Sequence, residues 1–336
     1  MSGVIGHTMY AILAVDSARK RKLPIVALIE RNQPSYHCGA YLGCDVQTMP
    51  EAICVDTGSE VGYGTASMEK SPITGGVIRL WSLEHGGKGY RPREIHRLFY
   101  GRAHLVFGWR SEDREHTVPW DHLADYCAAV VKDCRRMHPG NERALAYLLG
   151  WIAHIVGDSL IKSVQPGVDL QLHGGKYTPA NRPIQDMIAF HEVGRRELKL
   201  DWNKILMEAA RTPVEDIQLH YMRAVAPSGA LAEEFTNAWN PNHEDLARAV
   251  LKENRRYQVI RTPRIIKQLE LIETRHGWDC HPELTRRSLG LHYPDMQKLA
   301  KQANFRHALW QISEAIAKLF AEVLERVPDL ERPSAR

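Results

Sequence analysis

The apolar segment from Ala144 to Gly157 constrains the fold of this chain more than any other feature. Its fourteen residues include one strongly polar side chain, that of His154, and the segment runs directly into Asp158. Such a run is typical of a helix that is buried on nearly every side, and it is too short to cross a bilayer. Four steps along a helix return to the same face, so His154 and Asp158 are expected to lie side by side. A buried carboxylate needs a partner, so the pair predicts either a hydrogen bond within the core or a shared metal ion.

Helical spacing of apolar residues recurs along most of the chain, whereas the alternation typical of strands is scarce. The sequence therefore predicts an all-α protein in which strands are not needed. The segment 56–100 is rich in Gly, Ser and Thr and is predicted to be mostly loop, either a lid or rim over a site or a disordered segment. The expected helices lie at residues 7–21, 117–137, 142–163, 183–198, 202–211, 214–225, 243–256, 262–275 and 303–327.

Charge and cysteine content narrow the functional class. The formal net charge of +4 is too small to predict specific nucleic-acid binding. The basic stretch at 252–267 is interpreted as a solvated helix face, with phosphate contact as the alternative.

Six cysteines without a C-x-x-C spacing indicate reduced thiols, and the first residues lack the order of a secretory signal. No membrane anchor is apparent, so a cytoplasmic protein is expected; the oligomeric state stays open.

Four further side chains that bind metals well occur beside glycine or in apolar surroundings. His7 follows Gly6 at the head of the first apolar helix, and Asp45 ends the small-residue segment GAYLGCD. His104 has apolar neighbours on both sides, and His173 follows the central helix. Each of these residues alone is more typical of a hydrogen-bonded core residue. Only their order along the chain can therefore indicate a metal site.

That order resembles the zinc-dependent phospholipase C family. The elements are GH at residues 6–7, GAYLGCD at 39–45, the isolated His104 and LGWIAHIVGD at 149–158. The family includes bacterial phospholipases C, the catalytic domain of glycosylphosphatidylinositol-specific phospholipase D and, more distantly, zinc-dependent single-strand nucleases. The resemblance covers about residues 1–200 and implies an all-α helical bundle that hydrolyses phosphodiesters with zinc ions held in a cleft.

The resemblance also implies a ligand set. Asp45, His104, His154 and Asp158 would hold one zinc ion, and Asp158 would bridge to a second ion that His7 also binds. Zinc suits such nitrogen and oxygen ligands and makes hydroxide available near neutral pH. By the same resemblance, Asp45 is the candidate to orient that nucleophile or take its proton. Lys162 and Arg102 are the candidate phosphate contacts.

A third zinc site of the family is only partly matched. His173 supplies one ligand, Asp186 is the best candidate carboxylate, and His191 and Glu192 are the alternatives. Lys162 stands where relatives of the phospholipase D type have a histidine, and the amino-terminal amine that binds zinc in secreted relatives is not expected here. We therefore expect two zinc ions, and a third only if the site beside His173 binds metal.

The sequence thus predicts a zinc-dependent hydrolase that cleaves a phosphoester, most readily a phosphodiester. The alternative is a non-catalytic helical scaffold that keeps a degenerate zinc site and acts by binding a partner. Residues 1–200 would form the phospholipase C-like domain, and residues 201–336 a helical extension packed on it as a candidate cap. The substrate stays open among phospholipids, nucleotides and other phosphoesters.

Overall fold

The computed structural model describes most of the chain, namely residues 3–42, 49–103, 109–111, 114–116, 123–161, 181–224, 239–328 and 330, without 57, 59, 62–65 and 73. Only the backbone is described for residues 42, 96, 100–103, 109–111, 114–116, 158, 159, 161, 181, 221 and 224. Among the sequence-predicted site residues, Asp45, His104, Lys162 and His173 lie outside this part of the chain.

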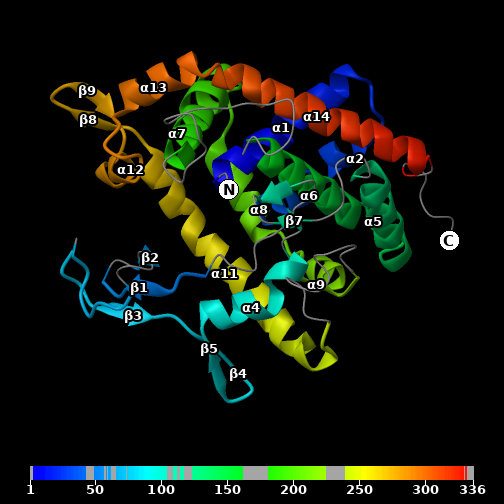
Figure 1. Cartoon of the computed structure of the whole chain (residues 1–336), viewed down its shortest axis with the longest axis horizontal. Helices are drawn as coiled ribbons and strands as arrows, with labels where there is room; N and C mark the ends of the chain where they lie inside the picture. Colours follow the sequence, from blue (N-terminus) through cyan, green and yellow to red (C-terminus); the bar gives the residue numbers. More distant parts are fainter. Residues whose placement is uncertain are drawn as a thin grey trace. The chain divides into compact units, whose positions relative to one another are not determined.

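The described chain is predominantly helical, which confirms the predicted class in its coarse form (Figure 1). The helices are α1 (Val4–Lys20), α2 (Ile25–Arg31), α3 (Gln33–Leu42), α4 (Pro92–Ala103), α5 (Leu123–Met137), α6 (Glu142–Ile161), α7 (Asn181–Ile188), η2 (Ala189–Glu197), α8 (Trp202–Arg211), α9 (Glu215–Ala224), η3 (Pro241–His243), α11 (Glu244–Leu269), α12 (Pro282–Arg287), α13 (Tyr293–Gln302) and α14 (Phe305–Arg326). Here η2 is a π-helical continuation of α7 and η3 is a 3₁₀ turn.

Short strands accompany the helices, and they correct the expectation that no strands would be needed. They are β1 (Ala52–Cys54), β2 (Glu60–Val61), β3 (Ile78–Leu80), β4 (Leu83–His85), β5 (Lys88–Tyr90), β6 (Trp109–Ser111), β7 (Arg114–His116), β8 (Ile272–Thr274) and β9 (Gly277–Asp279). All pairings are antiparallel, in one sheet of order β2-β1-β3 and three two-stranded hairpins.

The segment 56–100, predicted to be mostly loop, also contains β2 to β5 and the start of α4. Its strands have two or three residues each, too few for alternating polarity to be recognised. The glycines mark hairpin turns instead: Gly86 and Gly87 have φ of 58° and 76° between β4 and β5. Two adjacent residues with positive φ match the twist of a two-residue hairpin.

The chain forms two compact units, each assembled from segments far apart in sequence. Unit 1 comprises residues 1–43, 106–214 and 261–336, and unit 2 comprises residues 44–105 and 215–260. α11 contributes to both, so the two helices predicted at 243–256 and 262–275 are one helix up to Leu269. Pro263 removes one backbone donor but does not end it. The linear division at residue 200 stays a prediction.

Unit 1 is built around α6, the helix predicted from the longest apolar run. α3 packs along α6, and α1 packs against both α6 and α14, so the first and last helices of the chain pack against one another in this unit (Figure 1). The side chains of Trp151 and Ile152 are fully buried. The hydroxyls of Ser17 and Ser313 meet at 3.1 Å in the α1–α14 contact. Burial of apolar surface on all sides of α6 is therefore the main stabilising contribution to this unit.

The α3–α6 contact depends on glycine. A Cβ on Gly150 would lie 1.9 Å from the carbonyl oxygen of Tyr36, and a Cβ on Gly39 would lie 1.8 Å from that of Tyr147. Real Cβ atoms do not approach a carbonyl this closely, so only glycine at both positions allows the two backbones to meet. This close approach fixes the position of α6, along its axis, relative to the carboxyl-terminal end of α3.

Unit 2 has a separate apolar core between α4, α9 and the first part of α11. Its buried residues are Met49, Ile95, Phe99, Leu219, Met222, Leu246, Ala247, Val250 and Leu251. The three-stranded sheet belongs to the same unit, and the Tyr257 hydroxyl of α11 donates to Glu60 of β2 at 2.8 Å. None of the described helices in either unit combines the length and the apolar character that crossing a bilayer requires.

Candidate functional site

The candidate site centres on His154, which lies on α6 with only 6% of its surface exposed. Its Nδ1 lies 2.7 Å from the carbonyl oxygen of Ala40, near the end of α3. A carbonyl can only accept, so Nδ1 must be the donor, and in the neutral ring Nε2 carries the lone pair. Metal-binding histidines usually have their other ring nitrogen held in this way by a backbone carbonyl or a carboxylate. The α3–α6 approach thus fixes both the tautomer and the orientation of His154.

His7, at the end of the first turn of α1, stacks on His154. The two ring centroids are 3.9 Å apart and the planes differ by 13°. The edge of the Tyr10 ring contacts His7 from the same helix, and His7 is 5% exposed. Tyr10 also packs on α6, where a Cβ at Gly157 would lie 2.3 Å from its ring. Two sequence-predicted ligands from helices about 150 residues apart therefore meet in one buried contact.

The parallel stacking restricts how these rings can bind metal. A metal ion lies in the plane of its imidazole at ~2.0–2.1 Å from the nitrogen. Lone pairs in parallel planes do not converge, so the two rings are suited to two ions rather than to one. The zinc ligand set that the family resemblance implies stays a prediction.

Asp158 lies one turn after His154 on α6, and its backbone but not its side chain is described. Arg102 is in α4 of unit 2, also with only its backbone described. Asp45, His104, His173 and Lys162 are not among the described residues, so their roles stay predictions. In the described part of the chain, no group of three or more His, Cys, Asp or Glu side chains is placed to hold one ion.

Asp186 is described, and it lies at the amino-terminal end of α1. Its Oδ1 accepts a hydrogen bond from the Gly6 backbone N–H at 3.3 Å, and the Gly3 N–H also contributes. A Cβ on Gly3 would lie 1.9 Å from Oδ2, so the carboxylate occupies the space a side chain would fill. Burial raises the pKa of Asp186, and nearby Arg182 opposes that rise. Asp186 therefore caps the helix that carries His7.

The alternatives to Asp186 make contacts that tie helices together. His191 Nε2 lies 2.7 Å from the carbonyl oxygen of Leu269 in α11. Glu192 accepts hydrogen bonds from the Tyr293 hydroxyl and the Gln297 amide of α13, each at 2.8 Å. These contacts hold η2 against its neighbours, which gives both residues a structural role.

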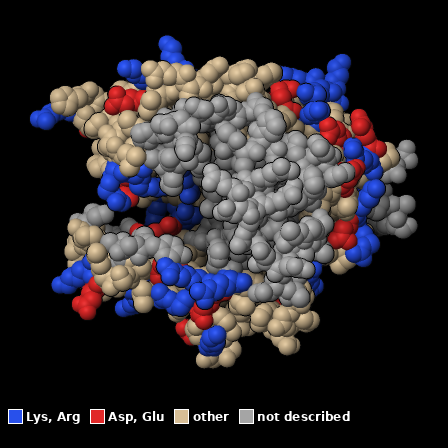
Figure 2. All heavy atoms as spheres, in the orientation of Figure 1, with Lys and Arg blue, Asp and Glu red and all other residues tan. Residues whose placement is uncertain are grey.

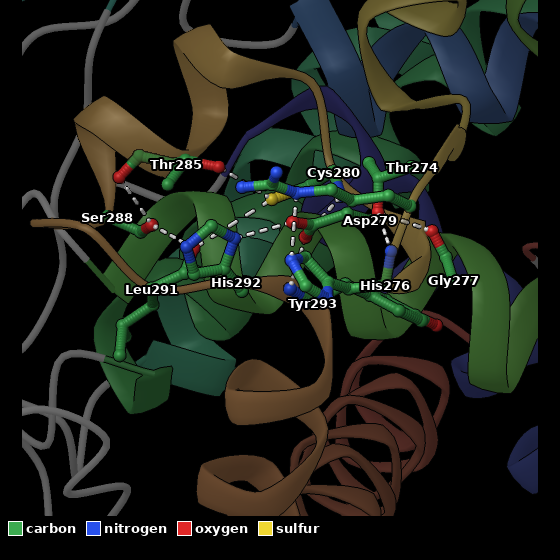
Figure 3. A network of polar contacts seen from close by, with 11 residues as sticks. Thr274, His276, Gly277, Asp279, Cys280, Thr285, Ser288, Leu291, His292 and Tyr293 are labelled. Carbon is green, nitrogen blue, oxygen red and sulfur yellow. Dashed lines mark hydrogen bonds and ion pairs between the residues drawn. The ribbon is translucent and has the colours of Figure 1, made fainter.

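Two polar features escaped the sequence reasoning. His37 is buried in α3, and burial lowers its pKa to about 4. In the β9–α13 region, the Asp279 carboxylate lies between the His292 ring, 2.5 Å from Nδ1, and the backbone N–H groups of Cys280 and Tyr293 (Figure 3). The signal for this second feature was the pair of aspartate and histidine that flank α12, but thirteen residues separate them.

Comparison of the chain with protein-family models, with curated proteins and with solved structures finds no match.

Proposed function

We propose that this chain is a zinc-dependent hydrolase that cleaves a phosphoester, with a phosphodiester as the preferred substrate class. One observation carries the proposal: buried His154 is oriented by the Ala40 carbonyl and stacked on His7, with Asp158 one helical turn away. An ordinary core histidine requires one hydrogen-bond partner but not a second histidine stacked in parallel. Two rings in parallel planes suit two neighbouring ions better than one shared ion, and a pair of metal ions is an arrangement that phosphoryl transfer uses.

Eight candidate residues have a defined part in the proposed reaction or its support. His154, Asp45 and His104 would hold one zinc ion, His7 the other, and Asp158 both. Zinc, when bound, lowers the pKa of water from ~15.7 to ~7 and neutralises charge on phosphoryl oxygens. Asp45 would orient the attacking water or accept its proton, and Lys162 and Arg102 would bind the phosphate. Asp186 we assign to capping α1, which keeps His7 in place against His154.

The proposal is tested by zinc-dependent hydrolysis of bis(p-nitrophenyl) phosphate. The parent, made metal-free with a chelator and then given zinc, is expected to regain turnover. His154→Gln should lose most of it, because removing one ligand disrupts the metal site. His307→Gln on the exposed face of α14 is the matched control and should behave as the parent.

Two results would argue against the hydrolase. If the parent shows no zinc-dependent turnover, the catalytic proposal fails. If zinc also leaves the stability of the folded chain unchanged, the stacked histidines are a core contact, and the scaffold alternative gains support.

A further inference from the structure

The three-stranded sheet of unit 2 has apolar side chains on both of its faces. The central strand β1 and the residue after it are all apolar, namely Ala52, Ile53, Cys54 and Val55. Ala52 and Cys54 share one face and are buried. Ile53 and Val55 alternate with them and lie on the other face, where Val55 is 43% exposed. A strand that is apolar on both faces is typical of a sheet that is covered on both sides.

The register between β1 and β3 extends this exposed face. Cys54 pairs with Ile78, and the next residue, Val55, donates its N–H to the Val77 carbonyl oxygen at 2.8 Å. Val55 and Val77 are therefore cross-strand neighbours. Val77 also forms an antiparallel bridge with Lys70 on its other side. The three side chains thus form one row on the same face, and Val77 is 52% exposed.

A second row lies beside the first. Ile53 pairs with Arg79, whose side chain is exposed. Met68 precedes Lys70 by two residues and is 47% exposed. Figure 2 shows tan and blue spheres together over the region of this sheet, at the lower left of the view. We call the exposed members of the two rows the open sheet face, namely Val55, Met68, Lys70, Val77 and Arg79.

The open sheet face is basic as well as apolar. In the part of the chain that the structure describes, neither Lys70 nor Arg79 has a hydrogen bond or an ion pair. The acidic residue in the same register is Glu60, which pairs with Ile53 at the far edge of the sheet. Its carboxylate accepts a hydrogen bond from the Tyr257 hydroxyl at 2.8 Å. Two cations beside three apolar side chains are therefore complementary to a partner that is anionic next to an apolar region.

We infer that the open sheet face is an interaction surface for an anionic phospholipid bilayer. Apolar side chains gain by entering the boundary between head groups and acyl chains, and the long stems of lysine and arginine keep their charges at the phosphates. A stable protein interface takes ~20–30 residues a side, whereas a bilayer requires neither that area nor a matched pocket. The inference goes beyond the proposed hydrolysis and does not rest on zinc.

The test is co-sedimentation of the full chain with vesicles, in the presence of a chelator so that zinc contributes nothing. One set of vesicles is phosphatidylcholine alone, and the other contains about one third phosphatidylserine. We expect the parent to bind the anionic vesicles at least about five-fold more tightly than the neutral ones, and added salt should release it. Lys70→Gln and Arg79→Gln should each weaken binding to the anionic vesicles about five-fold.

The double variant Val55→Thr/Val77→Thr tests the apolar part of the face. Threonine keeps the shape and the strand propensity of valine, so the variant should melt like the parent. It should bind the anionic vesicles about ten-fold more weakly, because two hydroxyls resist transfer out of water. Leu80→Thr is the matched control, since Leu80 is exposed on the same strand but pairs with buried Ala52 on the opposite face. Lys298→Gln, on the exposed side of α13, is the control for charge. Both controls should stay within about two-fold of the parent.

The inference is overturned if the parent does not bind the anionic vesicles. It is also overturned if Leu80→Thr and Lys298→Gln weaken binding as much as the variants of the open sheet face, because the net positive charge alone would then explain the attraction. Light scattering that finds two chains per particle in the parent and one in the double variant would assign the face to a second copy of the chain. Zinc content, measured in parallel without chelator, reports on the proposed function separately.

Discussion

Gly150→Ala tests whether the close approach of α3 and α6 is what the fold requires. The new Cβ would lie 1.9 Å from the Tyr36 carbonyl oxygen and 2.8 Å from the Ala40 backbone nitrogen. Since Cβ contacts below 3.0 Å are essentially absent from real structures, the helices would have to separate by about 1 Å. Overpacking of this kind costs about 1–3 kcal/mol, and the obstacle here is backbone, so we take the upper value. Alanine returns ~1 kcal/mol through its higher helix propensity.

The net loss is about 2 kcal/mol, which corresponds to a fall in Tm of about 4–8 °C. Differential scanning calorimetry of the parent and the variant measures it. Gly89→Ala is the matched control, because its Cβ meets the mobile end of Glu84 and should change Tm little. A variant of Gly150 that melts within about 1 °C of the parent would refute the reasoning, since it would mean that the helices are not in backbone contact.

Three further predictions concern titratable groups. Burial lowers the pKa of His37 to about 4, below the usual ~6.5. The contribution of His37 to the free energy of unfolding is therefore fully present above pH 6.5 and is lost as the pH falls toward 4. Between pH 7 and pH 5 the parent should lose about 2 kcal/mol in urea unfolding that His37→Gln does not lose, and equal losses would contradict this. At Asp279, burial raises the pKa, but the hydrogen bonds from Tyr293, His292 and Cys280 outweigh it and hold the pKa below its usual range. The stability that the Asp279 carboxylate contributes is present above about pH 4 and is lost in acid. Asp279→Asn should therefore lower Tm at pH 7, and its Tm should converge with that of the parent below pH 4. A difference in Tm that is the same at both pH values would contradict this prediction. Burial raises the pKa of Cys134 to about 12, so iodoacetamide should label it slowly at pH 8 until urea is added, and rapid labelling of the folded chain would show that it is accessible.

The helices with long, regular apolar stripes were predictable from sequence. The predicted helix at 202–211 has the observed bounds of α8, and the predicted ends of α6 are within two residues of those observed. The helices that were not predicted are α2, α3, α4, α12 and α13. α2 and α12 are short, and in α3 the glycine that looks like a helix breaker is required for packing. The sheet of β1 to β3 was missed because two or three residues carry no periodic signal.

The candidate site was predictable in part. The spacing of His154 and Asp158 and the position of His7 after glycine identified residues that the fold places on adjoining helices. The stacking of the two rings and the Ala40 contact depend on how α1, α3 and α6 pack, which spacing along the chain does not specify. Likewise, Asp186 was named as a candidate carboxylate ligand, but its place at the end of α1 arises from a contact across 180 residues.

The most direct test of the central proposal is the zinc content of the protein purified without added metal. Elemental analysis of the parent should give two zinc ions per chain. His154→Gln and Asp158→Asn should each reduce that content, whereas His307→Gln should not. Zinc that is absent from the parent even after incubation with the metal, or that is equal in all four proteins, would contradict the assignment of His154, His7 and Asp158 as a zinc site.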